Sequence, residues 1–129
     1  MIKAIDHIAI KVDDLLQVSS ALEALGLPAP KTKQFDEVGM KIAFMKVGEI
    51  YLELLKVTDD NSPIVNDPSG IHHIGIKTQD IEATYEKMAS SEQFELQGKI
   101  RKGAHTRIFF FKLTGNEKIL FECVEDKGK

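Results

Sequence analysis

Cysteine is nearly absent from this sequence, because Cys123 is the only one in 129 residues. A single thiol can form neither a disulfide framework nor a thiolate cluster, so any metal site must use nitrogen and oxygen ligands. The N-terminal residues also lack an apolar signal region and a small-residue cleavage site. Both absences are typical of a protein in a reducing compartment, and we expect a cytoplasmic protein.

Long apolar runs are also missing, and neither sign of charge dominates. Residues 50–55 form one of the longest apolar runs, but Glu53 interrupts it. A membrane-spanning helix needs about 20 apolar residues. The 17 lysine and arginine residues stand against 20 acidic ones, for a net charge of -3, so bulk charge does not favour binding to nucleic acid. We therefore expect neither a membrane span nor a nucleic-acid partner.

The sequence does contain an internal repeat. Residues 6–15 align with residues 72–81, and residues 41–47 align with residues 107–113. The offset is the same in both alignments, because 73 − 7 and 107 − 41 both equal 66. One offset shared by two separate segments favours a duplicated module over chance similarity between strands.

Each copy is predicted to form a βαβββ module. A β-branched strand comes first, an aspartate follows at the position of a helix N-cap, and a helix and three strands complete the module. The candidate caps are Asp13 or Asp14 in the first copy and Asp80 in the second. The predicted strands are residues 4–12, 31–35, 40–47 and 50–57, then 71–78, 94–100, 106–113 and 118–124, and the predicted helices are residues 15–25 and 81–90.

The two modules are expected to share one domain, residues 1–129. With 43% apolar residues, a chain of this length can form a single core. We assign module one to residues 1–58, a polar linker to residues 59–70 and module two to residues 71–126. The predicted fold class is α+β, with a curved, mixed and mostly antiparallel sheet that surrounds a metal cleft and carries the helices on its outer face.

Polar side chains recur at equivalent places in the two modules. His7 and His73 lie in the first strands, each two positions before a small residue. Glu53 and Glu122 lie inside the apolar last strands, where a carboxylate is costly to bury unless a positive charge compensates it. Two imidazoles and two carboxylates suit zinc, cobalt, nickel, iron or manganese better than magnesium or calcium. The sequence therefore predicts that these four residues bind one divalent cation.

Each of these residue types also has a purely structural explanation. A lone histidine in a strand is more often a hydrogen-bonded core residue than a metal ligand, and an acidic residue in a strand can face solvent. The recurrence of both types in both modules favours metal binding. His72 is interpreted as a non-ligand because it aligns with Asp6. His105 is interpreted as a loop residue, or as a residue that contacts one of the metal-binding side chains, and not as a metal ligand itself. Glu37 is a weaker candidate for the site, and solvent exposure is its preferred explanation.

This pattern resembles the vicinal oxygen chelate superfamily, also called the glyoxalase/bleomycin resistance/dioxygenase superfamily, which is built from paired βαβββ modules. The resemblance covers nearly the whole chain and implies metal ligands at the same four positions. Within the superfamily, the sequence looks most similar to methylmalonyl-CoA epimerases and then to glyoxalase I. The segments that carry the resemblance are residues 6–9, 39–44, 52–55, 61–64, 70–74 and 119–122.

The resemblance implies a metal-dependent isomerase or lyase that abstracts a proton next to a carbonyl or thioester. Methylmalonyl-CoA epimerase-like activity is the first expectation, and the activity of glyoxalase I, a lactoylglutathione lyase, is the alternative. Glu53 and Glu122 would remove and return the proton, while the metal stabilises the enolate oxygen. A further alternative is a metal-free small-molecule-binding or resistance protein with an aromatic cleft, for which the phenylalanines at 109–111 are candidates. A homodimer is also implied.

The implied substrate is an acyl thioester or a glutathione adduct, whose anionic tail needs cationic partners. Arg101, Lys102 and Arg107 are the candidate substrate-binding residues, and a solvated strand end is the alternative explanation for them. The sequence departs from the epimerase pattern at several places, including the first helix, which has Ser19 and Ser20 in place of a Phe-Tyr pair, and residues 112–113, which replace a His-Pro pair. The linker after the Ser-Pro-Ile sequence is short, and the glycine-rich loop is reduced to residues 103–107.

Overall fold

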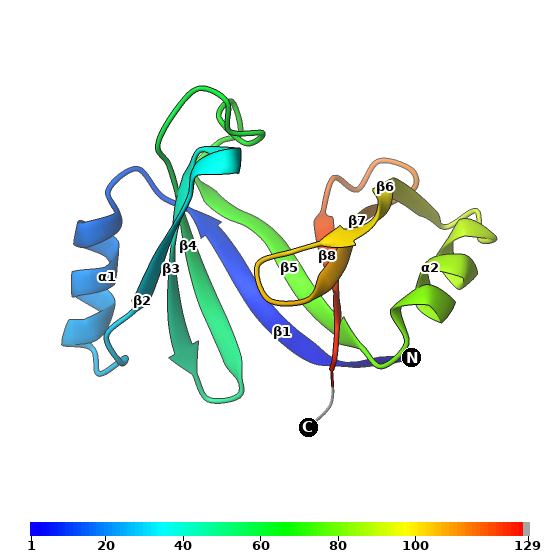
Figure 1. The fold of residues 1–129 in the computed structure, drawn as a ribbon, viewed down its shortest axis with the longest axis horizontal. Coiled ribbons are helices and arrows are strands. Elements are labelled where there is room, and N and C mark those ends of the chain that lie inside the picture. Colours follow the sequence, from blue (N-terminus) through cyan, green and yellow to red (C-terminus); the bar gives the residue numbers. More distant parts are fainter. Residues whose placement is uncertain (128–129) are drawn as a thin grey trace. The chain divides into compact units, whose positions relative to one another are not determined.

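The structure, a computed structural model, describes residues 1–127, and both modules have the predicted βαβββ order (Figure 1). The first module comprises β1 (Ile2–Lys11), α1 (Leu15–Ala24), β2 (Lys31–Phe35), the short 3-10 helix η1 (Asp36–Val38), β3 (Met40–Val47) and β4 (Ile50–Val57). The second module comprises β5 (Gly70–Thr78), α2 (Ile81–Ala89), β6 (Phe94–Lys102), β7 (Arg107–Leu113) and β8 (Leu120–Glu125).

The bounds of the elements agree closely with those predicted. β2, β3 and β4 have the expected bounds, and each helix ends one residue before its expected end. The prediction was wrong at the start of β8, which begins at Leu120 and not at residue 118. The turn between β7 and β8 is therefore longer than predicted, because residues 118 and 119, which were expected to begin β8, belong to the turn.

The chain divides into two compact units. The N-terminal unit comprises His7–His72, and the C-terminal unit comprises Met1–Asp6 together with the chain from His73 onward. Strands follow the order β2-β3-β4-β1 in the N-terminal unit and β5-β8-β7-β6 in the C-terminal unit. In each unit the first and last strands of the module pair in parallel, and the other pairs are antiparallel. The α+β class, the module order and the mixed sheet are therefore confirmed.

An aspartate caps each helix, as predicted. The Asp14 carboxylate accepts a hydrogen bond from the backbone N–H of Gln17 at 3.0 Å, and Asp80 accepts one from Ala83 at 3.0 Å. Such a cap stabilises a helix by about 1 kcal/mol. The sequence left Asp13 and Asp14 as alternatives, and the structure selects Asp14. No helix among the described residues is both long enough and apolar enough to cross a membrane.

Each face of the N-terminal sheet has its own apolar cluster. Side chains alternate along an extended chain, so Ile10 and Val12 lie on one face and Ala9 lies on the other. The first face packs against α1, as the sequence predicts. The cluster under α1 includes Ile10, Val12, Leu15, Val18, Leu22, Ala43, Met45 and Leu54. The cluster on the other face includes Ala9, Ile42, Phe44, Leu55 and Ile64.

The C-terminal unit packs α2 against one face of its sheet. Phe109 and Phe111 belong to the buried cluster beneath this helix. Phe110, between them, contacts the ring of His73 on the other face. The three phenylalanines thus alternate between the two faces of the sheet, and core packing explains Phe109 and Phe111. The other buried members of the cluster are Ile81, Met88 and Cys123.

The predicted linker folds against the N-terminal unit, where a buried lysine holds it. Nζ of Lys11 donates to the carbonyl oxygens of Ile64, Val65 and Asp67 at 2.9, 3.2 and 2.5 Å. Lys11 is only 7% exposed, and three carbonyls match the three donors of its ammonium group. Ile64 also enters the apolar cluster next to Ala9, so this segment is part of the core and not only a polar connection.

Candidate active site

The predicted ligands of module one form a buried imidazole–carboxylate pair. Glu53 of β4 lies in register between Ala9 of β1 and Phe44 of β3. Residues in register share a face of the sheet, and His7 lies two positions before Ala9, so His7 and Glu53 face the same way. Nδ1 of His7 is 3.4 Å from Oε2 of Glu53, and the two side chains are 3% and 13% exposed.

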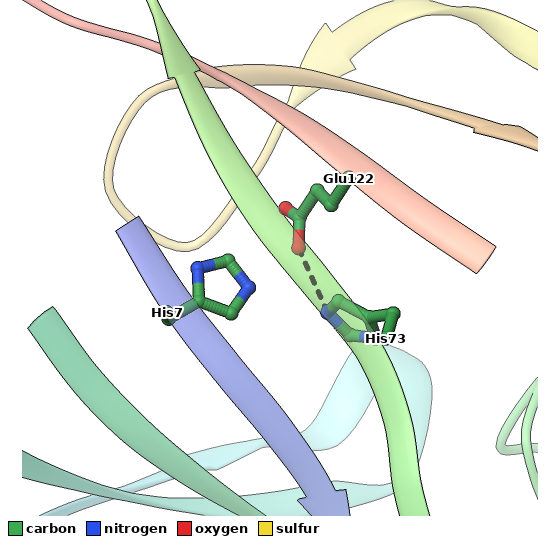
Figure 2. A group of neighbouring side chains, drawn as sticks. All are labelled: His7, His73 and Glu122. Atoms are coloured by element: carbon green, nitrogen blue, oxygen red, sulfur yellow. Dashed lines mark ion pairs between the residues drawn. The ribbon is translucent and has the colours of Figure 1, made fainter. Parts of the chain in front are cut away.

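The predicted ligands of module two form the equivalent pair. Glu122 of β8 lies in register between Gly75 of β5 and Phe110 of β7. Nε2 of His73 is 2.9 Å from Oε1 of Glu122, an ion pair that joins β5 to β8 (Figure 2). The Phe110 ring meets the His73 ring edge-on, with the centroids 5.3 Å apart. The phenylalanine therefore packs beside the histidine and shields one side of the pair from water.

The two pairs differ in sequence spacing and agree in strand register. The histidines are 66 positions apart, whereas the glutamates are 122 − 53 = 69 positions apart. The hairpin turn before the last strand comprises residues 48–49 in module one and residues 114–119 in module two. The longer turn thus displaces Glu122 along the sequence but leaves it opposite the same kind of small residue.

One residue beside the glutamates, Phe44, was not predicted as a site residue, and Phe110 was predicted only as one of the candidates for an aromatic cleft. Phe44 and Phe110 flank the two glutamates in register, and they are themselves 110 − 44 = 66 positions apart. The repeat offset was therefore the signal that could have identified them. From the sequence, only the phenylalanines at 109–111 were expected to line a cleft, and their counterpart in module one, Phe44, was not.

The residues of each pair fit the predicted cation. Imidazole nitrogen and carboxylate oxygen are donor types that first-row transition metals accept in a site without thiolates. A largely buried carboxylate needs a compensating positive charge, which either a protonated histidine or a bound metal ion supplies. The same two donor types come together in both units, and this repetition extends to the small residue and the phenylalanine that flank each glutamate.

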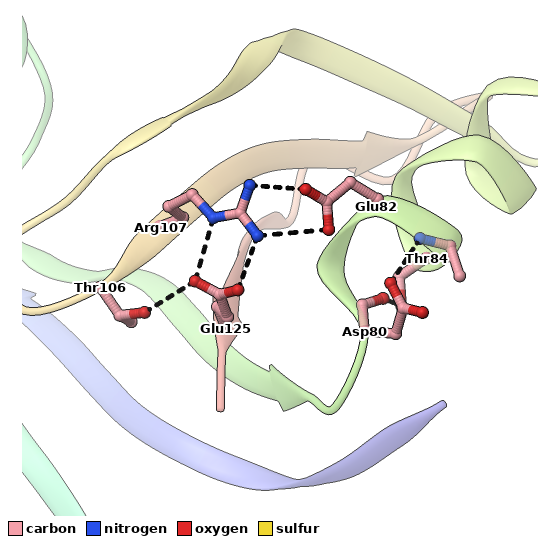
Figure 3. A network of polar contacts seen from close by, with 7 residues as sticks. Asp80, Glu82, Thr84, Thr106, Arg107 and Glu125 are labelled. Carbon is pink, nitrogen blue, oxygen red and sulfur yellow. Dashed lines mark hydrogen bonds and ion pairs between the residues drawn. The ribbon is translucent and has the colours of Figure 1, made fainter. Parts of the chain in front are cut away.

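Arg107 lies on the face of the C-terminal sheet that packs against α2, in a network with two carboxylates (Figure 3). Its guanidinium donates to Glu125 at 2.7 and 3.1 Å and to Glu82 at 2.6 and 3.2 Å. Hydrogen bonds from Arg107 lower the pKa of Glu125 to about 2 and also lower the pKa of Glu82, and they hold the pKa of Arg107 above its usual range. Two carboxylates thus already neutralise the charge that was predicted to bind substrate.

Arg101 and Lys102, the other two basic candidates, lie on different faces of the same sheet. Arg101 is in register with Ile108, and Lys102 is in register with Arg107. Because side chains alternate along β7, Arg101 shares the face of Phe110, whereas Lys102 shares the face of Arg107. The three basic residues that are close in sequence therefore do not form one cluster.

The remaining candidates have separate surroundings. Nε2 of His72 lies 2.7 Å from Oδ2 of Asp67 in the N-terminal unit, which fits its interpretation as a non-ligand. His105 is exposed in the turn between β6 and β7, and Glu37 is exposed in η1. Neither has the burial that characterises the two imidazole–carboxylate pairs.

Cys123 adjoins Glu122 in β8 but is fully buried on the α2 side of the sheet. Burial raises the pKa of its thiol to about 12, and the nearby charge of Glu122 adds to this effect. A thiol with such a pKa stays protonated near neutral pH and is a poor nucleophile. Cys123 is therefore a core residue of the C-terminal unit.

The fold and the paired residues define the class of this protein. Two βαβββ modules each carry a buried imidazole–carboxylate pair at the same strand positions. The family model of the Glyoxalase/Bleomycin resistance protein/Dioxygenase superfamily matches residues 6–111. The chain belongs to this superfamily, so the resemblance inferred from the sequence is confirmed.

Several relatives within the superfamily are epimerases. Mitochondrial methylmalonyl-CoA epimerase of Mus musculus is 27% identical over an alignment of 113 residues. The match covers 83% of this chain and 64% of the mouse protein, so the chain spans slightly less than two thirds of that relative. Ethylmalonyl-CoA/methylmalonyl-CoA epimerase of Cereibacter sphaeroides is 28% identical over an alignment of 118 residues, and the match covers 86% of this chain and 88% of that protein. A structure of Streptomyces coelicolor methylmalonyl-CoA epimerase in complex with 2-nitronate-propionyl-CoA has a TM-score of 0.81 and 26% identity, and the match covers 99% of this chain and 100% of that one.

Proposed function

We propose that this protein is a metal-dependent enzyme of the methylmalonyl-CoA epimerase type. It removes the proton next to the carbonyl of an acyl thioester and returns a proton to the opposite side of the same carbon. The observation that carries the proposal is the repeated row of a small residue, a glutamate and a phenylalanine, with a histidine beside each glutamate. The epimerase names of the relatives support the same reaction class.

The proposed ligands of one divalent cation are His7, Glu53, His73 and Glu122. Two nitrogens and two oxygens leave coordination positions open for water or substrate in a transition-metal site. A bound divalent cation would supply electrostatic stabilisation for the negative charge that develops on the carbonyl oxygen during proton removal. The identity of the metal within the group from manganese to zinc does not affect this assignment of residues.

The proposed acid–base residues are Glu53 and Glu122. Epimerisation needs one group that removes the proton and a second that delivers a proton from the other side, and each module offers one carboxylate. Each carboxylate has two oxygens, so one oxygen can serve as a ligand while the other accepts or donates the proton. Phe44 and Phe110, next to the two glutamates, would limit the access of water to the proton in transfer.

Proton exchange tests this proposal directly. Purified protein is loaded with Co²⁺ or Zn²⁺, and methylmalonyl-CoA is incubated with it in D₂O while deuterium at the carbon next to the thioester is measured by mass spectrometry. We expect exchange that depends on the metal and is lost in His73→Ala. The adduct of methylglyoxal with glutathione is assayed in parallel, and turnover of that adduct alone would replace the epimerase proposal with a lyase.

Metal analysis separates an enzyme from a binding protein of the same fold. We expect wild-type protein to retain one equivalent of a divalent metal and His7→Ala to lose it. A protein that binds thioesters equally well with and without metal, and exchanges no proton, would contradict the proposed function. The homodimer and the cytoplasmic location expected from the sequence remain predictions.

A further inference from the structure

A single arginine shares the face of the C-terminal sheet that carries the imidazole–carboxylate pair. His73, Glu122 and Phe110 lie on this face, and Phe110 is in register with Gln97 of β6. The next residue of β6 that pairs with a β7 residue on this face is Arg101, which lies opposite Ile108. On the side of the sheet that faces away from α2, the edge strand thus carries a positive charge at Arg101 and, further along, a negative charge at Glu95, which is in register with Lys112.

An irregularity in β6 brings Arg101 to this position. Four steps along β6, from Gln97 to Arg101, are matched by only two steps along β7, from Phe110 to Ile108. The additional residues include Gly98, whose φ of +94° is one that other residues rarely adopt, and Tyr85 of α2 donates to its carbonyl oxygen at 3.2 Å. Such bulges commonly redirect a side chain next to a functional site.

The guanidinium of Arg101 is held in place by contacts that do not neutralise it. Its central carbon lies 5.2 Å from the centroid of the Phe110 ring, and Nη1 donates to the carbonyl oxygen of Lys99 at 3.0 Å. The same Nη1 would lie only 3.2 Å from a Cβ at Gly98, so the absence of a side chain there makes room for it. Within residues 1–127, no carboxylate forms an ion pair with Arg101.

This arrangement contrasts with that of Arg107 in the neighbouring strand. Arg107 uses its donors on Glu82 and Glu125, whereas Arg101 uses one donor on a backbone carbonyl. A guanidinium has five N–H donors in a planar fork that matches a carboxylate or a phosphate. Arg101 therefore keeps most of its donors, and its full charge, available to an anion.

We propose that Arg101, stacked on Phe110 beside the His73–Glu122 pair, binds an oxyanion of the substrate and so selects for acyl thioesters that carry negative charge. This inference rests on the proposed function for the identity of the substrate. The oxyanion is either a phosphate of coenzyme A or a carboxylate on the acyl group, and both present the same paired oxygens to the guanidinium. Arg101 thus acts as a specificity residue, since it does not exchange a proton with the substrate.

The test compares Arg101→Gln, Arg101→Lys and a charge-matched control, Lys87→Gln, on the exposed side of α2. In the epimerase assay we expect Arg101→Gln to raise KM for methylmalonyl-CoA about tenfold or more with kcat within about twofold. Arg101→Lys, which keeps the charge and loses the fork, should show an intermediate KM. Equal KM values for wild type and Arg101→Gln, or an equal rise in Lys87→Gln, would overturn the proposal.

Calorimetry with coenzyme A and with methylmalonyl-CoA identifies the oxyanion and remains informative if the protein is not an epimerase. Weaker binding of both ligands by Arg101→Gln assigns the contact to a phosphate, and weaker binding of methylmalonyl-CoA alone assigns it to the acyl carboxylate. Unchanged affinity for both ligands contradicts the role of Arg101. If wild type binds these ligands through Arg101 but exchanges no proton, the proposed function fails and the inference about Arg101 stands.

Discussion

The two modules use one repeated lysine in different ways. Lys11 and Lys77 are 77 − 11 = 66 positions apart, at the end of the first strand of each module. Lys11 is buried and binds three carbonyl oxygens of the segment that follows β4. Lys77 has a side chain that is 30% exposed, and its Nζ is 3.7 Å from the Asp6 carboxylate, a distance typical of a weak surface ion pair.

This difference shows which parts of the repeat are tied to local loops and which are not. The histidine, the small residue, the glutamate and the phenylalanine keep the same strand register in both modules. The contacts of the repeated lysine, Lys11 or Lys77, depend instead on the segments that lie next to it. A site built on strand register is thus maintained in both modules, although the loops and turns around it differ in length.

The largest expected effect comes from replacing either glutamate, and it tests whether the two modules contribute equally to proton transfer. If both carboxylates transfer protons, Glu53→Gln and Glu122→Gln should each lower kcat for deuterium exchange at least about 100-fold, because general acid–base catalysis contributes that much or more. Glutamine retains the shape of the side chain and removes the charge. Thermal unfolding of the same samples controls for loss of structure, and a large loss in only one variant would show that the modules have unequal chemical roles.

A second prediction sharpens the comparison of the two lysines. Lys11→Met removes the donor to three carbonyls in a buried segment, and we expect it to lower the free energy of unfolding by about 3 kcal/mol. Lys77→Met removes only a weak ion pair and should cost less than about 1 kcal/mol. Urea unfolding followed by circular dichroism measures both values. If both variants lost the same free energy of unfolding, the buried contacts of Lys11 would stabilise the protein no more than the surface ion pair of Lys77, which would contradict this prediction.

A third prediction concerns the Arg107 network of the second module. Its expected effect on stability is smaller and depends on pH. The pKa of Glu125 is lowered to about 2 from 4.5 by hydrogen bonds from Arg107, so the ionised carboxylate stabilises the folded state above pH 4.5. That stabilisation is lost as the pH falls from about 4.5 to about 2. After allowance for the exposure of Arg107, we expect Glu125→Gln to cost about 1–2 kcal/mol at pH 7.

The control for this prediction lies in the other module. Lys41 is the counterpart of Arg107, since 107 − 41 = 66, but it is exposed and forms no ion pair with a described residue. Lys41→Gln should therefore leave stability unchanged within about 0.5 kcal/mol at any pH. The stability curves of wild type and Glu125→Gln should meet near pH 2. A constant difference between them down to that pH would show that the network does not act through the charge of Glu125.

Most of the fold was predictable because it depends on local sequence pattern. Alternating apolar residues identify the strands, and Asp80 identifies the start of α2 through its cap. The repeat offset identifies both histidines. The two adjacent aspartates at the start of α1 could not be separated, because either residue type can cap a helix and only the backbone conformation selects Asp14.

The parts that escaped prediction depend on contacts between distant segments. The bonds of Lys11 join residues 53 to 56 positions apart, and their acceptors are backbone carbonyls of an irregular loop, which no side-chain pattern reveals. Arg101 and Arg107 were grouped because they are close in sequence. The bulge in β6 and the alternation along β7 place them on opposite faces, and neither effect is visible in composition or spacing.

The most direct test of the account is the stoichiometry of metal binding. Metal-free wild type, His7→Ala and His73→Ala are titrated with Co²⁺ by calorimetry, with circular dichroism to verify folding. If one cation is shared by the pairs of both modules, wild type binds one Co²⁺ per chain, and each single variant weakens that binding at least about 100-fold. Two independent cations per chain, or a His7→Ala protein that binds Co²⁺ as tightly as wild type, would contradict the claim.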